Sequence, residues 1–199
     1  MEEFLNPGPL IDRELELVAP AEQFVDDLLT ACAHPLTRLQ SPIEARTTRQ
    51  QVIAFLASAP QGQEPSQADA ARVAQYHFWM RLRDEYVGAV GSPAIRHLGG
   101  ISLRIGSSEA IQMYYGNFGY HVMPAARGRH YAERACRLLL PLARRHNLQP
   151  IWITCNPDNF ASRSTCEHLG AKLIEIVAVP ETDPLYARGE HFKCRYRIE

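Results

Sequence analysis

Apolar residues occur along this chain in two alternating patterns, short apolar runs and longer helical stripes. Short runs of apolar or alternating positions predict β-strands, whereas apolar residues spaced three or four apart predict α-helices. Strands are predicted at residues 10–18, 73–82, 97–105, 118–123, 151–155, 171–179 and 191–198. Helices are predicted at residues 21–32, 47–56, 127–146 and 159–169. Turn residues between the second and third strands indicate an antiparallel hairpin, and the whole order predicts an α/β or α+β domain.

The segment 127–146 has the clearest helical pattern. It places Leu139 and Leu142 on one face, while its arginines fall largely elsewhere. Pro141 interrupts this helix, and an interior proline costs about 3 kcal/mol and removes one backbone donor. We therefore expect a kink or an early end near that residue.

Composition limits the possible functions without selecting one. The chain has 199 residues, of which 46% are hydrophobic, so it can bury a full core and is interpreted as one domain, 1–199. The polar segment 57–70 is predicted to be a surface loop rather than a domain boundary. The net charge of -1 gives no support for a nucleic-acid or membrane partner. The sequence shows neither a membrane-spanning apolar run nor a signal-peptide pattern, which predicts a cytoplasmic protein.

The cysteines and histidines do not form a recognisable ligand motif. The five cysteines are scattered without a CxxC pair, and the eight histidines include no HExxH spacing. We therefore expect neither a disulfide framework nor a metal site, and we interpret most of the cysteines as small core residues.

The junction between the fourth predicted strand and the long helix is a candidate anion site. The chain runs through Pro124 into the turn Arg127-Gly128-Arg129. A glycine lets the backbone approach a ligand closely, the first N–H groups of the helix are free, and the two arginines add positive charge. The alternative is an ordinary connection with solvated arginines, since the spacing matches neither a Walker nor a dinucleotide-binding motif.

Two segments, GNFGYHVMPAARGRHYAERA and ITCNPDNFASRSTCEHLGAKL, together resemble the GNAT superfamily of acyl-CoA-dependent N-acyltransferases. The similarity is closest to a bacterial branch of predicted acetyltransferases with the pattern Gly-x-x-Gly-Tyr-x-Val-x-Pro, and it extends from about residue 101 to 176. The pattern is formed here by Gly116, Gly119, Tyr120, Val122 and Pro124.

The resemblance implies a fold as well as a cofactor. The GNAT fold has a mixed, mostly antiparallel sheet of about six or seven strands, splayed in the middle and flanked by about four helices, with acetyl-CoA in the gap. It implies a cofactor-binding core at about 97–179 and an acceptor side in the N-terminal segment 1–72.

The resemblance also implies which residues contact acetyl-CoA. Tyr120, His121 and Val122 would offer backbone groups to the pantetheine arm. The remaining cofactor contacts implied are Arg127, Gly128, Arg129, His130, Tyr131, Ala132, Asn159 and Ser162. His130 stands where the family usually has glycine, so its side chain either obstructs the phosphates or becomes a phosphate partner. Asn159 is alternatively a simple helix cap, with Gly170 closing the same helix.

The implied reaction is direct attack by a primary amine on the thioester in a ternary complex. Cys166 stands where many members carry a tyrosine that protonates the departing thiolate, although a small core cysteine is the alternative interpretation. The glutamate used as a base in one branch is replaced by Gly116 and Asn117. His121 ranks first among the remaining candidate bases, which also include Tyr115, Tyr120 and Glu109.

The acceptor is expected to be a small-molecule or peptide amine, and the protein a monomer or homodimer. Four residues on adjacent strands are candidates for the acceptor pocket, and the arginine among them suggests a carboxylate-bearing acceptor. They are Tyr76, His77, Trp79 and Arg104. Two alternatives stay open: a catalytically silent acyl-CoA-binding or regulatory domain, and a general phosphate-ligand enzyme. The latter would have no need of the helix after Asn159.

Overall fold

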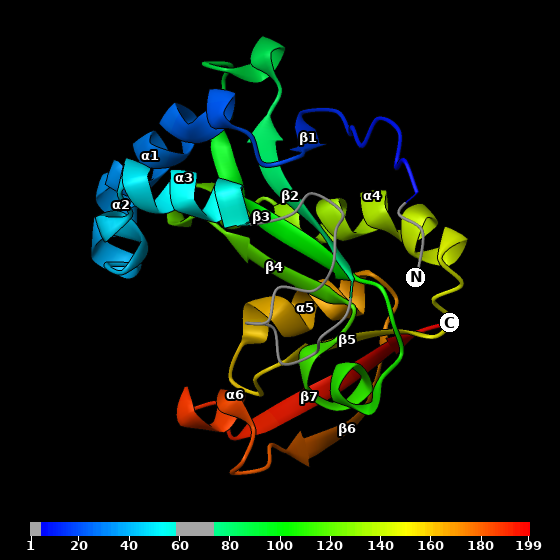
Figure 1. Ribbon diagram of the computed structural model, residues 1–199. Helices are drawn as coiled ribbons and strands as arrows, with labels where there is room; N and C mark the ends of the chain where they lie inside the picture. The colour runs from blue at the N-terminus through cyan, green and yellow to red at the C-terminus, as the bar shows by residue number, and fades with distance from the viewer. Residues whose placement is uncertain (1–4, 59–73) are drawn as a thin grey trace.

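The strands form two antiparallel sheets that meet at one point. The computed structural model describes residues 5–58 and 74–199 (Figure 1). The first sheet has the order β1-β2-β3-β4 and consists of β1 (Leu15–Val18), β2 (Gln75–Leu82), β3 (His97–Arg104) and β4 (Phe118–Val122). The second has the order β5-β7-β6 and consists of β5 (Ile151–Cys155), β6 (Lys172–Ala178) and β7 (Phe192–Ile198). The predicted strand count and the splayed arrangement are confirmed.

The two sheets are joined between the start of β4 and β5. The Asn117 N–H donates to the Trp152 carbonyl at 2.6 Å, and the Trp152 N–H donates to Asn117 Oδ1 at 2.8 Å. Gly116 allows this approach: its φ is +66°, and a Cβ there would lie 2.9 Å from the Thr154 nitrogen. Beyond this junction β4 pairs with β3 and β5 pairs with β7, so the strands diverge and leave a gap.

Six α-helices surround the sheets in the described part of the chain (Figure 1). They are α1 (Val25–Ala33), α2 (Pro35–Gln40), α3 (Arg49–Ser58), α4 (Tyr131–Arg145), α5 (Phe160–His168) and α6 (Pro184–Ala187). Side chains along β2 point alternately to the two faces of the sheet, so different helices pack on each face. Trp79 packs with Val25 of α1 and Val52 of α3, whereas Phe78 and Met80 belong to the main core with residues of α4. Among the described residues, no helix is both long and apolar enough to cross a bilayer.

Several predicted boundaries are wrong for identifiable reasons. β1 begins at Leu15 rather than at residue 10, because the chain before it turns back and Ile11 forms only an isolated bridge with Glu16. α4 begins at Tyr131 rather than 127, because Gly128 and His130 both have left-handed backbones. The helix does not end at Pro141 but continues to Arg145.

The short helical elements were not predicted. α2 and α6 each have a proline in the first turn, Pro35 and Pro184, and a side-chain cap, a combination that does signal a helix start. A π-helical turn occupies Ile111–Tyr115, where a connection was expected. α3 extends to Ser58, so the predicted 57–70 loop begins later than expected; its remainder lies outside the described residues.

Candidate functional site

Two cavities open along the gap between the sheets. We call the first the inner cavity: it has a volume of about 470 Å³ and lies between β4 and β5, with Gly119 and Thr154 in its walls. The second, the outer cavity, has a volume of about 560 Å³ and lies between the start of α4 and α5. Both are lined by Tyr120, Asn159 and Ser162. The two cavities therefore adjoin at these three residues, and we refer to them together as the cleft.

Tyr120 occupies the middle of this cleft. Its hydroxyl lies 2.8 Å from Ser162 Oγ and 4.0 Å from Cys166 Sγ. Burial raises the pKa of the Tyr120 phenol above its usual range, and the neighbouring Cys166 and Cys136 act in the same direction. The phenol therefore stays protonated at neutral pH and is available as a hydrogen-bond donor.

The thiol that faces the cleft belongs to Cys155 rather than to Cys166. Cys155 lines the inner cavity, whereas Cys166 is fully buried on α5 and lines neither cavity. The hydrogen bond with Cys166 is the main cause that lowers the pKa of Cys155 to about 7, against the effect of burial. The same pairing raises the pKa of Cys166. Sequence reasoning missed Cys155, although its position at the end of a buried strand was a usable signal.

The turn before α4 has the conformation that an anion site requires. Gly128 has φ +77° with open space beside it, and His130 has φ +58° and provides no side-chain cap for the helix. His130 thus adopts the left-handed backbone that glycine would supply, at a cost of about 1–2 kcal/mol. The first N–H groups of α4 are left for water or a ligand. Asn159 Oδ1 accepts from the Ser162 N–H at 3.0 Å, so the predicted cap of α5 is confirmed.

The two turn arginines are exposed, and each also donates hydrogen bonds within the protein. Arg127 donates through Nε to the Val122 carbonyl at 3.1 Å and through Nη1 to Gln40 Oε1 at 3.2 Å, and Arg129 donates to the Gly91 carbonyl. Both side chains still line the outer cavity. Their exposure agrees with the alternative of solvated arginines, whereas their place in the cavity wall agrees with an anion site, so both interpretations stay open.

Tyr131 has its side chain in the core. It is almost fully buried, and its hydroxyl donates to Glu14 Oε1 at 3.2 Å. Because the side chain points away from the cleft, Tyr131 can contact a ligand there through its backbone only. Its neighbour Ala132 lines the outer cavity as expected.

His121 points away from the inner cavity. It lines the outer cavity and also a third, side cavity of about 490 Å³, which borders α1 and α3. The imidazole lies over Gly100, where a Cβ would be 2.8 Å from its Cε1. Desolvation of the imidazole by the surrounding protein lowers the pKa of His121. The charge of Arg127 lowers it further, whereas the charge of Glu44 opposes the shift. His121 is therefore neutral at pH 7.

The other candidate bases are less well placed. Tyr115 lines the inner cavity, but its hydroxyl donates to Asp183 Oδ1 at 2.8 Å. Glu109 is exposed and lines none of these three cavities. Asn117, which stands where one branch of the family has its glutamate base, is buried. Its side chain joins the two sheets, so its role is structural.

The four residues expected around the acceptor do not converge. Arg104 lines the inner cavity and Trp79 the side cavity. Tyr76 forms hydrogen bonds with Leu5 and His146, and His77 contacts the Phe55 ring. The expectation of one pocket is wrong because neighbouring strand residues point to opposite faces of the sheet.

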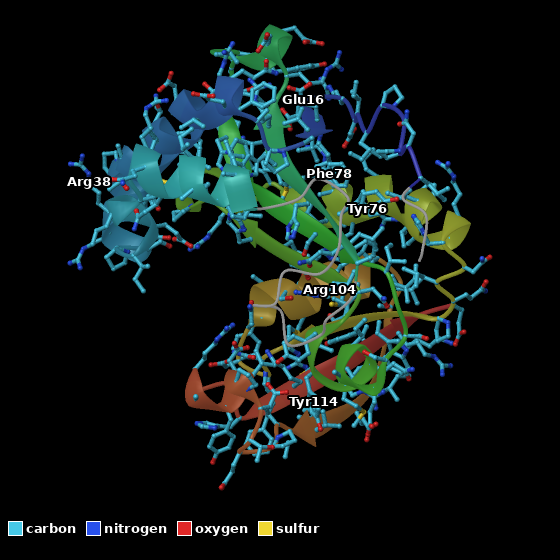
Figure 2. All side chains as sticks on the ribbon, viewed as in Figure 1. Glu16, Arg38, Tyr76, Phe78, Arg104 and Tyr114 are labelled. Atoms are coloured by element: carbon cyan, nitrogen blue, oxygen red, sulfur yellow. The ribbon has the colours of Figure 1, made fainter. Side chains whose placement is uncertain are left out.

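Among the described residues, the side chains that line the inner cavity include more cations than anions. Arg104, Arg188 and Lys193 belong to this described lining, as does the carboxylate of Glu190, which pairs with Lys193. Arg104 Nη1 also donates to the carbonyls of Tyr115 and Gly116 at 3.2 and 3.3 Å. Figure 2 shows Arg104 at the gap between the two sheets, with Tyr114 nearby on the second sheet's side. This end of the cleft is therefore suited to an anionic group.

A seven-stranded sheet that splits in its middle, with a helix N-terminus facing the gap, has the architecture of the acyl-CoA-dependent N-acyltransferases. A family model for the acetyltransferase (GNAT) domain matches residues 14–172. The chain therefore belongs to the GNAT acetyltransferase family, which confirms the resemblance. No curated protein matches this sequence.

Solved structures of acetyltransferases share the fold at low sequence identity. The microcin C7 self-immunity acetyltransferase MccE, in complex with acetyl-CoA and AMP, is 15% identical with a TM-score of 0.64, and 94% of this chain and 93% of that chain are covered. The ribosomal L7/L12 α-N-protein acetyltransferase RimL, in complex with coenzyme A, is 15% identical with a TM-score of 0.63 and coverages of 96% and 97%. An acetyltransferase from Agrobacterium tumefaciens is 16% identical with a TM-score of 0.57 and coverages of 100% and 98%.

Proposed function

We propose that this protein transfers the acetyl group of acetyl-CoA to a primary amine by direct attack in a ternary complex. One observation carries the proposal: two cavities, one at the uncapped start of α4 and one in the gap between β4 and β5, adjoin at the protonated phenol of Tyr120. The nucleotide would lie in the outer cavity and the thioester at the constriction. The acceptor would then enter the inner cavity. The acetyl-CoA and coenzyme A bound to two of the similar structures support this cofactor.

Backbone groups supply most of the proposed cofactor contacts. The N–H groups at the start of α4 would bind the pyrophosphate, and the open space beside Gly128 lets it approach. Arg127 and Arg129 would supply positive charge from the wall of the outer cavity while keeping their hydrogen bonds to the protein. The gap-facing backbone of β4 at Tyr120 and Val122 would pair with the pantetheine amides.

We assign the protonation of the departing thiolate to Tyr120. The Cys166 thiol lies behind the Tyr120 hydroxyl and lines neither cavity, so it cannot reach the thioester directly. The phenol is in the cleft, is protonated and is held by Ser162 at 2.8 Å. Cys166 then acts by packing against Tyr120, and the family's tyrosine on the helix is replaced by one on the strand.

His121 is the proposed base. An alkylamine must lose a proton before it attacks, which costs about 4.6 kcal/mol at pH 7 for a pKa near 10.4. A neutral imidazole at the outer cavity can accept that proton through water. His121→Gln should lower kcat and remove the decline of activity on the acid side of the pH profile. An unchanged profile would reject this role.

The charge of the inner cavity favours an acceptor that carries a carboxylate. Arg104 and Arg188 would bind the carboxylate, while Glu190 would attract the ammonium of the incoming amine. We place the acceptor in this cavity rather than beside the N-terminal helices. The described part of segment 1–72 contributes Glu44 to the outer cavity and most of one wall of the side cavity.

The test combines cofactor binding with thiol release. Acetyl-CoA affinity is measured first, and coenzyme A release is then measured with paired acceptors, each amino acid beside the amine that lacks its carboxylate. We expect faster release with the carboxylate-bearing member and a loss of that preference in Arg188→Gln. Binding without release on any amine would favour the silent acyl-CoA-binding domain. No binding of acetyl-CoA would reject the proposal.

A further inference from the structure

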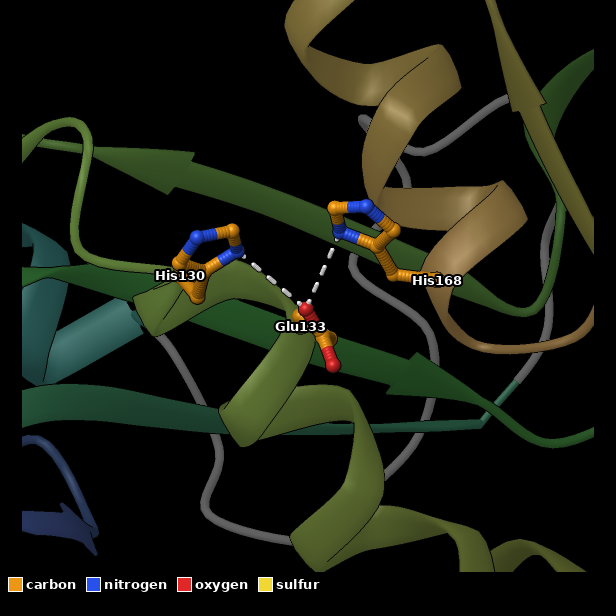
Figure 3. Close-up of side chains that lie close together, drawn as sticks. All are labelled: His130, Glu133 and His168. Atoms are coloured by element: carbon orange, nitrogen blue, oxygen red, sulfur yellow. Dashed lines mark ion pairs between the residues drawn. The ribbon is translucent and has the colours of Figure 1, made fainter.

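Three metal-ligating side chains converge where the start of α4 meets the end of α5 (Figure 3). The Nδ1 atoms of His130 and His168 each lie 3.3 Å from Glu133 Oε2. All three ligand atoms lie within 4.8 Å of one another. The side chains of His130 and His168 are 61% and 49% exposed, whereas Glu133 is only 17% exposed. The cluster is thus open to solvent on its histidine side.

The carboxylate at the centre of the cluster is held in a fixed orientation. Its second oxygen, Glu133 Oε1, accepts from Arg137 Nε at 3.1 Å, and Arg137 Nη2 lies at the same distance. Arg137 Nη2 also donates to the His168 carbonyl at 2.5 Å. Arg137 therefore leaves Oε2 for the two histidines and ties the end of α5 to α4. Such outer hydrogen bonds are the usual means of orienting metal ligands.

The two nitrogen–oxygen separations in the cluster fit a tetrahedral ion. Zinc binds histidine nitrogen and carboxylate oxygen at about 2.0–2.1 Å, and two such ligands in a tetrahedron are then about 3.3 Å apart. Both measured nitrogen–oxygen separations equal this value. We propose that His130, Glu133 and His168 bind a divalent transition-metal ion of the zinc class, with one coordination position open. No spacing motif along the chain indicates this site, because His168 lies on a different helix from Glu133.

The position of the site links the ion to the cofactor, and this link rests on the proposed function. His130 and His168 both line the outer cavity, so the open coordination position faces the place where the nucleotide phosphates would lie. A phosphate oxygen can fill that position. Because linkage is reciprocal, the ion should raise the affinity for the nucleotide and the nucleotide the affinity for the ion.

Metal binding is tested on untagged, full-length protein without cofactor. Zn²⁺ is titrated in competition with a chromophoric zinc indicator, and Co²⁺ is added separately because its visible bands distinguish tetrahedral from octahedral sites. We expect one equivalent bound with a tetrahedral spectrum, and at least about tenfold weaker binding in His168→Ala and Glu133→Gln. His191→Ala is the matched control, because His191 is exposed and contacts the Tyr186 ring, away from this cluster.

His130→Gly guards against loss of folding as an explanation. Glycine adopts the left-handed backbone of this position without strain, so the variant should fold at least as well as the wild type while losing one ligand. Weaker metal binding with unchanged or higher thermal stability would support the site. Absence of stoichiometric binding in the wild type, or wild-type affinity in both His130→Gly and His168→Ala, would overturn the site.

The link to the cofactor is measured with desulfo-coenzyme A, which has no thiol to bind zinc. We expect its dissociation constant to fall at least about tenfold when Zn²⁺ is present, a coupling within the usual allosteric range, and to be independent of Zn²⁺ in His168→Ala. If the wild type binds Zn²⁺ but its affinity for desulfo-coenzyme A does not change, the link to the cofactor is overturned and the metal site is retained. Metal binding together with no affinity for the coenzyme at all instead rejects the proposed function.

Discussion

The buried amide of Asn117 is expected to hold the two sheets together. Its side chain donates to the carbonyls of Arg104 and Gly106 at 3.2 and 3.0 Å and accepts from the Trp152 N–H at 2.8 Å. Asn117→Leu keeps the volume but removes all three bonds. Each buried backbone group left without a partner costs about 1–3 kcal/mol, so the free energy of unfolding should fall by about 3–5 kcal/mol.

A loss of this size is a large part of the stability of an ordinary domain, which is about 5–15 kcal/mol. Urea unfolding followed by circular dichroism would show it as a lower midpoint, with cofactor affinity measured in parallel. Asn6→Leu is the control, since Asn6 is exposed and, within the described residues, its side chain accepts only from the Gly8 N–H. A change below about 1 kcal/mol in Asn117→Leu would refute the idea that these bonds fix the junction.

Four further predictions address the junction, the chemistry and the pH dependence. Gly116→Ala should destabilise the protein and weaken acetyl-CoA binding, because its Cβ would press on the backbone of β5. Tyr120→Phe should lower kcat by about 100-fold with little change in the KM for acetyl-CoA. Burial lowers the pKa of His97 to about 3, so the unfolded chain takes up a proton first as the pH falls. Stability should drop by about 2 kcal/mol between pH 7.5 and 5, and His97→Asn should lack this loss. Iodoacetamide should modify Cys155 increasingly as the pH rises through 7, and bound acetyl-CoA should protect it.

Each of these predictions has a result that contradicts it. Wild-type cofactor affinity in Gly116→Ala would mean that the junction tolerates a wider separation. An unchanged kcat in Tyr120→Phe would mean that Tyr120 does not protonate the departing thiolate. Equal pH slopes of unfolding in wild type and His97→Asn would show that His97 titrates normally. Labelling that is insensitive to acetyl-CoA would place Cys155 away from the thioester.

The strands and the long helices could be predicted because their apolar periodicity is local. The range of β5 matches its prediction, and the start of α4 failed only because the left-handed backbone of His130 cannot be seen in a pattern of apolar positions. The short α2 and α6 depend on caps and prolines rather than on periodicity. Secondary structure was therefore predictable wherever a repeated pattern determined it.

The candidate site was predictable only at the level of segments. The two stretches that form the cleft were identified together, but which side chain faces the gap depends on the direction of each strand and helix. Cys166 was chosen by its place in a motif, whereas the structure turns Cys155 and Tyr120 toward the cleft. The cluster of His130, Glu133 and His168 depends on the packing of two helices, which no local pattern contains.

The divergence of β4 and β5 gives the protein two sheet edges that face inward. An exposed edge strand carries a row of unpaired backbone groups that can pair with another chain, and proteins usually protect such edges with charge, proline or a bulge. Here the edges are shielded by facing each other across a narrow gap that closes at Asn117 and Trp152. Their gap-facing backbone groups need hydrogen-bond partners, which a bound ligand provides. The gap that admits a ligand therefore also prevents two unpaired edge strands from pairing with strands of other molecules.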